Sequence, residues 1–181
     1  MKAITVLALL ASAAALAETP TPTPSRDELA AVERSIYNKL AKFHVEAPAD
    51  ILGLPRGIYL DGYGAVFTAE LGTLLTPGMG PFRPAIGKDE IAQIRAAKEK
   101  RMPEVRTLMQ QMLVDAAATL DRVPANENIV IGFVFFYNKW EDRGKMPKMI
   151  TMRAGKAALI EAAAGRATPQ TLAQAIQVRE E

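Results

Sequence analysis

Two tyrosines and a carboxylate lie close together in the sequence and could grip a sugar or a peptide. Asp61 and Tyr63 belong to the stretch Asp61-Gly62-Tyr63-Gly64, and Tyr59 precedes them. An aromatic pair beside a carboxylate offers the mixture of apolar and polar groups that ligand sites use. The alternative is that the two glycines mark a bulge or sharp bend within a strand pair, with the tyrosines packing on the surface.

A second candidate is the proline- and glycine-rich segment 76–84, which contains Met79 and Phe82. Long irregular loops in compact domains often carry function, so this segment could be a lid or a partner-binding loop. The alternative is a simple connector that tucks Phe82 into the core.

The third candidate is Trp140, which begins the stretch Trp-Glu-Asp-Arg at 140–143 after the most apolar segment of the chain. A lone tryptophan at the tip of a hairpin can anchor a binding partner. Glu141 and Asp142 are adjacent, and adjacent residues in a strand point in opposite directions, which argues against a paired acid–base site. A solvated turn with a packed tryptophan is the alternative.

Most familiar catalytic constellations are absent from the sequence, so the catalytic residues stay unknown. Only Ser25 and Ser35 follow residue 17, and there is no G-x-S-x-G elbow, phosphate-binding glycine loop or G-x-G-x-x-G. The one histidine, His44, falls at the end of a predicted helix, where the helix dipole favours it. Without cysteine, neither thiol chemistry nor a Cys-based zinc site is available. We therefore expect no metal and no cofactor.

The charge balance gives no sign of a nucleic-acid partner. The chain holds 22 Lys and Arg against 20 Asp and Glu, and loss of Lys2 with a signal peptide leaves a surplus of one positive charge. Charges of both signs are interspersed, as on an ordinary solvated surface.

Residues 1–17 have the pattern of a cleavable signal peptide. A positive start at Lys2 precedes the apolar run 3–15, and Ala15-Leu16-Ala17 is an A-x-A cleavage signature before Glu18. The sequence therefore predicts a periplasmic or secreted protein without a membrane span after cleavage. An uncleaved signal that anchors the chain in the inner membrane is the alternative. The Thr-Pro repeat within 18–25 predicts a stiff, extended spacer.

Hydrophobic spacing predicts the regular elements of a single domain at 26–181. A capping box at Ser25 and Glu28 opens an amphipathic helix over 26–44. Glycine-interrupted strand segments are expected within 58–71, a main strand at 129–137 and a returning strand at 148–152. Three further helices are expected. The first is a long helix from 88 to 120 that should be kinked or broken near Pro103. The second covers 154–164, and the third begins at Thr168 and includes Leu172, Ile176 and Val178.

This order of elements predicts an α+β fold. A small mixed sheet of about three to four strands should pack against the long helix, which can link two parallel neighbours as a crossover. The strand at 129–137 is apolar on both sides, so it should be central and covered on both faces, with the N-terminal helix on the face away from the long helix.

The sequence favours an exported, non-enzymatic domain that binds an envelope protein or assembles with itself. A small-ligand or glycan binder is the second hypothesis, and it requires Tyr59, Asp61, Tyr63 and Trp140 to converge. A carboxylate-dependent hydrolase is the third. It needs two acidic groups facing each other across a cleft, and no spacing in the sequence indicates such a pair.

Overall fold

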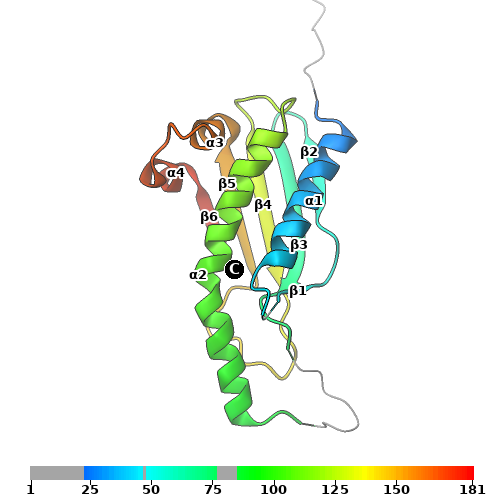
Figure 1. Ribbon diagram of the computed structural model, residues 1–181, viewed down its shortest axis with the longest axis vertical. Helices are drawn as coiled ribbons and strands as arrows, with labels where there is room; N and C mark the ends of the chain where they lie inside the picture. The colour runs from blue at the N-terminus through cyan, green and yellow to red at the C-terminus, as the bar shows by residue number, and fades with distance from the viewer. Residues whose placement is uncertain (1–22, 47, 77–84) are drawn as a thin grey trace, which may run out of the picture.

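The computed structural model describes residues 23–46, 48–76 and 85–181 (Figure 1). Within these residues it has an α+β fold with four helices and a mixed six-stranded sheet, larger than the three to four strands expected. The long helix packs against this sheet as predicted. The signal segment, most of the spacer, Met79 and Phe82 lie outside the described residues.

The first helix, α1 (Arg26–Lys42), begins with the predicted capping box. The Glu28 amide donates to Ser25 Oγ at 3.2 Å, and the Ser25 amide donates to Glu28 Oε2 at 2.7 Å. Two otherwise unsatisfied donors of the first turn are thereby paired. The apolar stripe of α1 is buried as its spacing predicts: Leu29, Val32, Ile36 and Leu40.

The long helix, α2 (Lys88–Thr119), is one continuous helix, so of the kink or break expected near Pro103 the break does not occur. Proline removes a single backbone donor from the helix. Met102 and Val105 on either side of it are buried in the core. Packing of this stripe therefore holds the helix together through the proline.

The sheet is built around a parallel pair of strands that α2 connects, as predicted. The hairpin partner of the second main strand, expected at 148–152, is also confirmed. The strand order is β1-β3-β4-β5-β6. β2 also pairs with β3, next to β1. All pairs except β3–β4 are antiparallel. The bounds are β1 (Asp50–Ile51), β2 (Arg56–Leu60), β3 (Gly64–Gly72), β4 (Asn128–Phe135), β5 (Met149–Gly155) and β6 (Gln177–Glu180).

The chain ends in a strand where the sequence predicted helix. The helices α3 (Lys156–Ala163) and α4 (Pro169–Ala175) match expectation, including the Thr168 N-cap. Val178, however, belongs to β6. Two interactions favour the strand. Arg106 of α2 donates two hydrogen bonds of 2.6 and 2.9 Å to the Glu180 carboxylate. The edge of β5 also offers backbone hydrogen-bond partners to a neighbouring strand, which a helix could not use.

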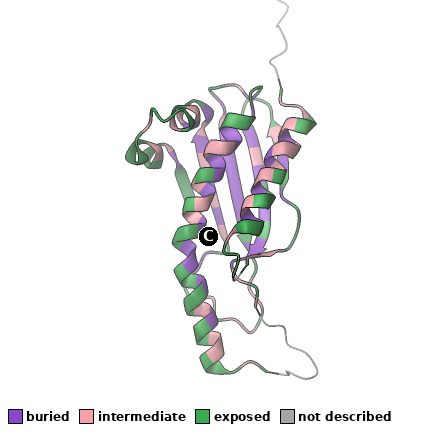
Figure 2. Cartoon of the chain, in the orientation of Figure 1, coloured by how far each residue is buried: buried purple, intermediate pink, exposed green. Residues whose placement is uncertain are grey.

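Both long helices cover the same face of the sheet, so the expected position of α1 on the other face is wrong (Figure 1). The inward residues of β4, which are Ile129, Ile131, Phe133 and Phe135, are buried against the helices (Figure 2). β4 is central, as predicted, but its outward side includes Gly132 and Val134 and is not covered by a helix or strand of the described residues. The apolar run of β4 thus reflects one face buried against the helices and one face on which Val130 and Gly132 are buried by neighbouring side chains while Val134 is exposed.

The hairpin between β2 and β3 depends on Gly64. Its φ is +129°, and a Cβ atom there would lie 1.9 Å from the Asn128 carbonyl oxygen of the adjacent strand. Only glycine allows β3 and β4 to begin side by side at this point. The predicted bend within a strand pair is confirmed here.

We expect Gly64→Ala to lower the free energy of unfolding by about 2 kcal/mol or more, because it adds backbone strain and a steric clash. Gly53→Ala is the matched control, since a Cβ at Gly53 meets no atom within 4 Å. Urea denaturation of both variants measures the difference. Equal stability of the two variants would contradict this account of the hairpin.

Candidate functional site

Tyr59 is a structural residue that points toward the helices. It pairs with Ala65 and packs against the core, and its hydroxyl donates to Glu127 Oε1 at 3.1 Å. Burial, together with the nearby Glu127 carboxylate, raises the pKa of Tyr59 to about 12. The hydroxyl therefore stays protonated at neutral pH and serves as a hydrogen-bond donor.

Tyr63 lies on the opposite side of the hairpin from Tyr59. The turn residues Asp61 and Tyr63 are exposed, and Tyr63 lines a shallow groove with Thr151 and Arg153 on the outward face. In a straight strand, residues 59, 61 and 63 would share a face. The positive φ of Gly62, +73°, turns the chain between them and breaks this alternation.

Trp140 is far from the tyrosines, because it lies beyond the other end of the sheet. Gly64 pairs with Asn128 at the start of β4, whereas half-buried Trp140 follows the end of β4. The four residues of the ligand-binding hypothesis therefore do not form one site. A ligand that touched all of them would have to span the length of the sheet.

The polar groups around Glu127 are largely paired within the fold, and among the described residues only its Oε2 lacks a hydrogen-bond partner there. The buried Glu127 carboxylate also accepts a hydrogen bond from the Gly62 amide at 3.1 Å, which ties the β2–β3 turn to the start of β4. Beside it, Lys156 Nζ donates to the carbonyls of Leu120 and Val123 at 2.6 Å each. Burial lowers the pKa of Lys156. This lysine closes the C-terminal end of α2 and is not free for chemistry.

A buried ion pair that the sequence analysis missed lies at the opposite end of the sheet. Lys98 Nζ of α2 contacts Glu141 Oε2, and the two side chains are only 2% and 3% exposed. The Asn138 side chain donates to Glu141 Oε1 at 2.8 Å, and the Tyr137 ring centroid lies 5.3 Å from Lys98 Nζ. We call these four residues the Lys98 cluster.

The Lys98 cluster holds segment 138–147 against the part of α2 that extends past the sheet (Figure 1). Burial raises the pKa of Tyr137 to about 12, and its hydroxyl donates to the Pro147 carbonyl at 2.9 Å. Because the two charged groups pair with each other and are almost fully buried, the cluster fastens the loop to α2. The sequence contained an indication of this buried lysine, because Lys98 falls on the apolar stripe of α2 between Ile94 and Met102.

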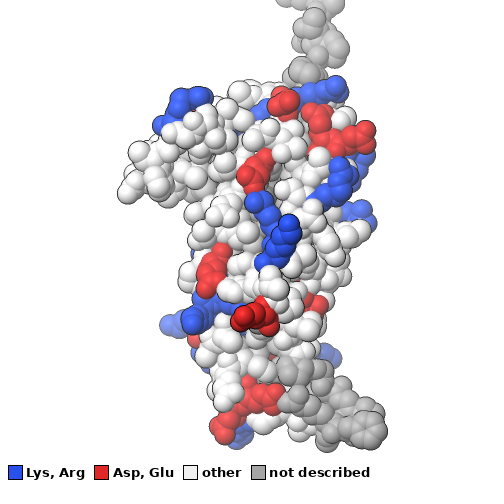
Figure 3. All heavy atoms as spheres, viewed as in Figure 1, with Lys and Arg blue, Asp and Glu red and all other residues white. Residues whose placement is uncertain are grey.

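The described residues contain no group of three or more His, Asp and Glu side chains arranged to hold a metal ion. His44 pairs its Nε2 with a Glu104 oxygen of α2. In the helix-covered view, positive and negative side chains are interspersed over the surface (Figure 3). No helix within the described residues is long and apolar enough to cross a bilayer.

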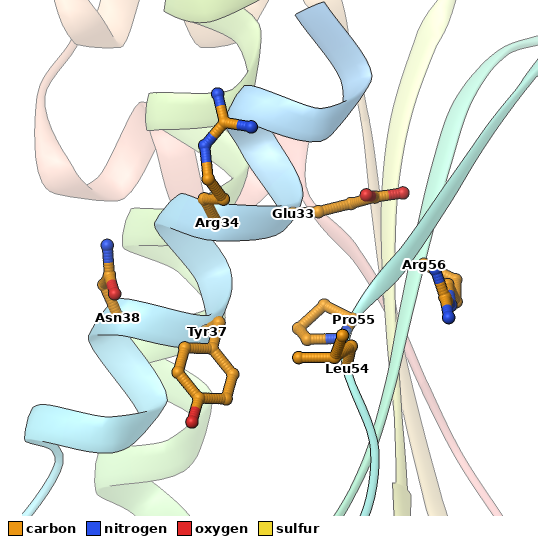
Figure 4. A pocket seen from close by; sticks show the side chains of 7 residues that line it. All are labelled: Glu33, Arg34, Tyr37, Asn38, Leu54, Pro55 and Arg56. Atoms are coloured by element: carbon orange, nitrogen blue, oxygen red, sulfur yellow. The ribbon is translucent and has the colours of Figure 1, made fainter. Parts of the chain in front are cut away.

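A small groove opens between α1 and the segment that leads into β2 (Figure 4). We call it the α1–β2 groove, and its volume is about 190 Å³. The Tyr37 ring lies across from Leu54 and Pro55, while Arg34 and Arg56 lie on opposite sides of the opening (Figure 4). The remaining lining residues are Glu33 and Asn38.

The second accessible surface is the outward side of the sheet, which we call the open face. Strand alternation places these residues opposite the buried ones. The open face comprises Arg56, Ile58, Leu60, Val66, Thr68, Glu70, Val130, Gly132, Val134, Met149, Thr151 and Arg153, with Phe136 beyond the end of β4. Of these residues, Val130 and Gly132 are buried by their neighbours and the others are at least partly exposed. It carries several of the large apolar side chains that stay exposed in the described residues, among them Ile58, Val134 and Phe136.

We expect Lys98→Met to lower the free energy of unfolding by about 3–5 kcal/mol, because it leaves the Glu141 charge buried without its partner. The double variant Lys98→Met/Glu141→Leu should recover most of this loss, since it removes both charges. Arg95→Met is the control: Arg95 pairs with exposed Asp142, and its loss should have only a small effect. Guanidinium denaturation of the variants measures these changes, and a double variant no more stable than Lys98→Met would contradict the assignment.

Comparison with known proteins finds no matching family model, curated protein or solved structure. The geometry described above is therefore the basis on which a function is proposed.

Proposed function

We propose that this protein is a non-enzymatic interaction domain that assembles with a second copy of itself through the open face of its sheet. The observation that supports this proposal is the one-sided burial of the sheet. Both long helices lie on one face, while Ile58, Val134 and Phe136 on the other are 55%, 42% and 43% exposed. Exposed apolar surface that is gathered on one face is typical of interaction sites.

The dimensions of the open face suit a dimer interface. The four strands β2 to β5 lie about 4.8 Å apart, and the central strands have about eight residues rising about 3.3 Å each, which gives a face of roughly 19 Å by 26 Å, or about 500 Å². Stable interfaces bury roughly 600–1,000 Å² on each partner. The open face therefore supplies most of the area at the lower end of this range, and the adjoining strand β6 extends the same surface.

The composition of the open face favours a second copy over an unrelated partner. Its middle row consists of Thr68, Gly132 and Thr151, which are small and leave the centre of the face flat. A flat sheet face is complementary to another sheet face, as in sandwich packing, and two-fold dimers are the commonest assemblies. The face carries both Glu70 and Arg153, so like-charge repulsion does not prevent self-association.

We expect the purified chain to form a dimer that Val134→Lys weakens at least about tenfold, because a lysine charge would have to be buried at the interface. Val45→Lys is the matched control, since Val45 is exposed outside the sheet. Light scattering after size exclusion, over a series of protein concentrations, measures both. A wild-type chain that stays monomeric at every concentration would overturn the proposal, as would a Val45→Lys variant that dissociates equally.

We further propose that the domain acts after export, in the periplasm or outside the cell. The support is the signal-like pattern of residues 1–17, with its A-x-A motif before Glu18. Expression of the full chain in a bacterial host should give an exported protein whose intact mass corresponds to residues 18–181. A protein of full mass in the membrane fraction would indicate an uncleaved anchor instead, and a full-mass cytosolic protein would contradict export.

A further inference from the structure

From the geometry of the α1–β2 groove we infer a docking site for an extended acidic segment of another protein. One apolar side chain of that segment would lie between Tyr37 and Leu54, and its neighbouring carboxylates would meet Arg34 and Arg56. This site lies beside α1 and shares only Arg56 with the edge of the open face, so a substitution at the centre of that face tests the two proposals separately.

The walls of the groove are apolar and accessible. Tyr37 is 40% exposed and Leu54 is 63% exposed, while Pro55 between Leu54 and β2 is buried. Figure 4 shows the Tyr37 ring on one side and the Leu54 and Pro55 side chains on the other. An apolar side chain entering from solvent would cover all three.

The charges at the groove favour an anionic partner. Within the described residues, the guanidinium groups of Arg34 and Arg56 make no hydrogen bond or ion pair; that of Arg56 has only a longer-range charge interaction with Glu33. Glu33 is already satisfied, because its carboxylate pairs with Arg26 and accepts the Gly57 amide at 2.7 Å. Two guanidinium groups are therefore left to bind carboxylates, which they can contact in a bidentate geometry.

The edge of β2 determines how the segment can bind. At Gly57 the outer amide donates to Glu33, and the carbonyl accepts from Arg26 Nη1 at 3.1 Å. Pro55 has no amide hydrogen to offer. A bound segment therefore cannot extend the sheet at this edge as an added strand, and it must be recognised through its side chains.

The size of the groove favours a segment of a protein over a free small molecule. Small-molecule pockets usually enclose about 300–1,000 Å³, whereas this groove has about 190 Å³. That volume suits one apolar side chain. A further positive group, Lys42, lies further along α1 and lines an adjoining shallow depression with Arg34 and Asn38. The positive character thus continues along the helix, as an extended ligand requires.

The test uses a fluorescein-labelled blocked peptide, Glu-Asp-Leu-Glu-Asp, titrated with the purified chain and followed by fluorescence anisotropy. We expect saturable binding that rising salt weakens. Replacing leucine by serine in the peptide should weaken binding about tenfold or more, because the apolar contact is lost. The basic peptide Lys-Arg-Leu-Arg-Lys should not bind.

Variants of the chain locate the site. Arg34→Glu and Leu54→Glu should each weaken binding of the acidic peptide about tenfold, since both add a negative charge at the groove. Lys100→Glu on the exposed side of α2 makes the same charge change as a control and should leave binding unchanged. Val134→Lys should also bind the peptide normally, which separates this site from self-association. Equal affinity for acidic and basic peptides, or equal weakening by Lys100→Glu and Arg34→Glu, would overturn the inference.

Discussion

A single face of the sheet carries the hydrophobic core of this protein, and the positions of both long helices follow from that. Phe67 and Leu71 of β3 and Ile131 and Phe133 of β4 point to the same side and are fully buried there. The apolar stripes of α1 and α2 each need such a surface, so the two helices must share it and pack against one another. Gly57 completes this layer, because a Cβ atom on it would lie 2.4 Å from the Phe67 ring. The consequence is an opposite face that the fold leaves accessible.

Charged groups stabilise the structure at the edges of the hydrophobic core. Lys98 and Glu141 fasten a polar loop to the overhanging half of α2, and Lys156 binds the carbonyls of the C-cap residue Leu120 and of Val123 in the turn that follows the same helix. At the sheet edge, the Arg26–Glu33 pair binds both backbone groups of Gly57. Each of these charges satisfies polar groups that would otherwise be costly to remove from water. Together they explain why several conspicuous titratable residues of this chain serve structure rather than chemistry.

The two proposed binding surfaces differ in shape and charge, and β2 lies between them. The open face is broad, flat and of mixed charge, which suits another sheet. The α1–β2 groove is small, apolar at its walls and positive at its rim, which suits an acidic segment. The outward side chain of Ile58 belongs to the first surface, whereas Pro55, just before β2, belongs to the second. A domain with this arrangement can assemble with itself and still hold a different partner.

The sequence by itself determined the local elements: the capped helix at Ser25, the long helix, the parallel pair it connects and the hairpin at Gly62 and Gly64. These follow from periodicity and from residues with special backbone preferences, which act over short distances. Only the tertiary structure decided that α1 joins α2 on one face, that Val178 lies in a strand, that Tyr59 and Tyr63 separate, and that Lys98 meets Glu141. The physical reason is that an apolar stripe reports which side of an element is buried but not which element covers it. Contacts between residues far apart in the chain produce no periodic pattern in the sequence, because they depend on how all the elements pack around the core.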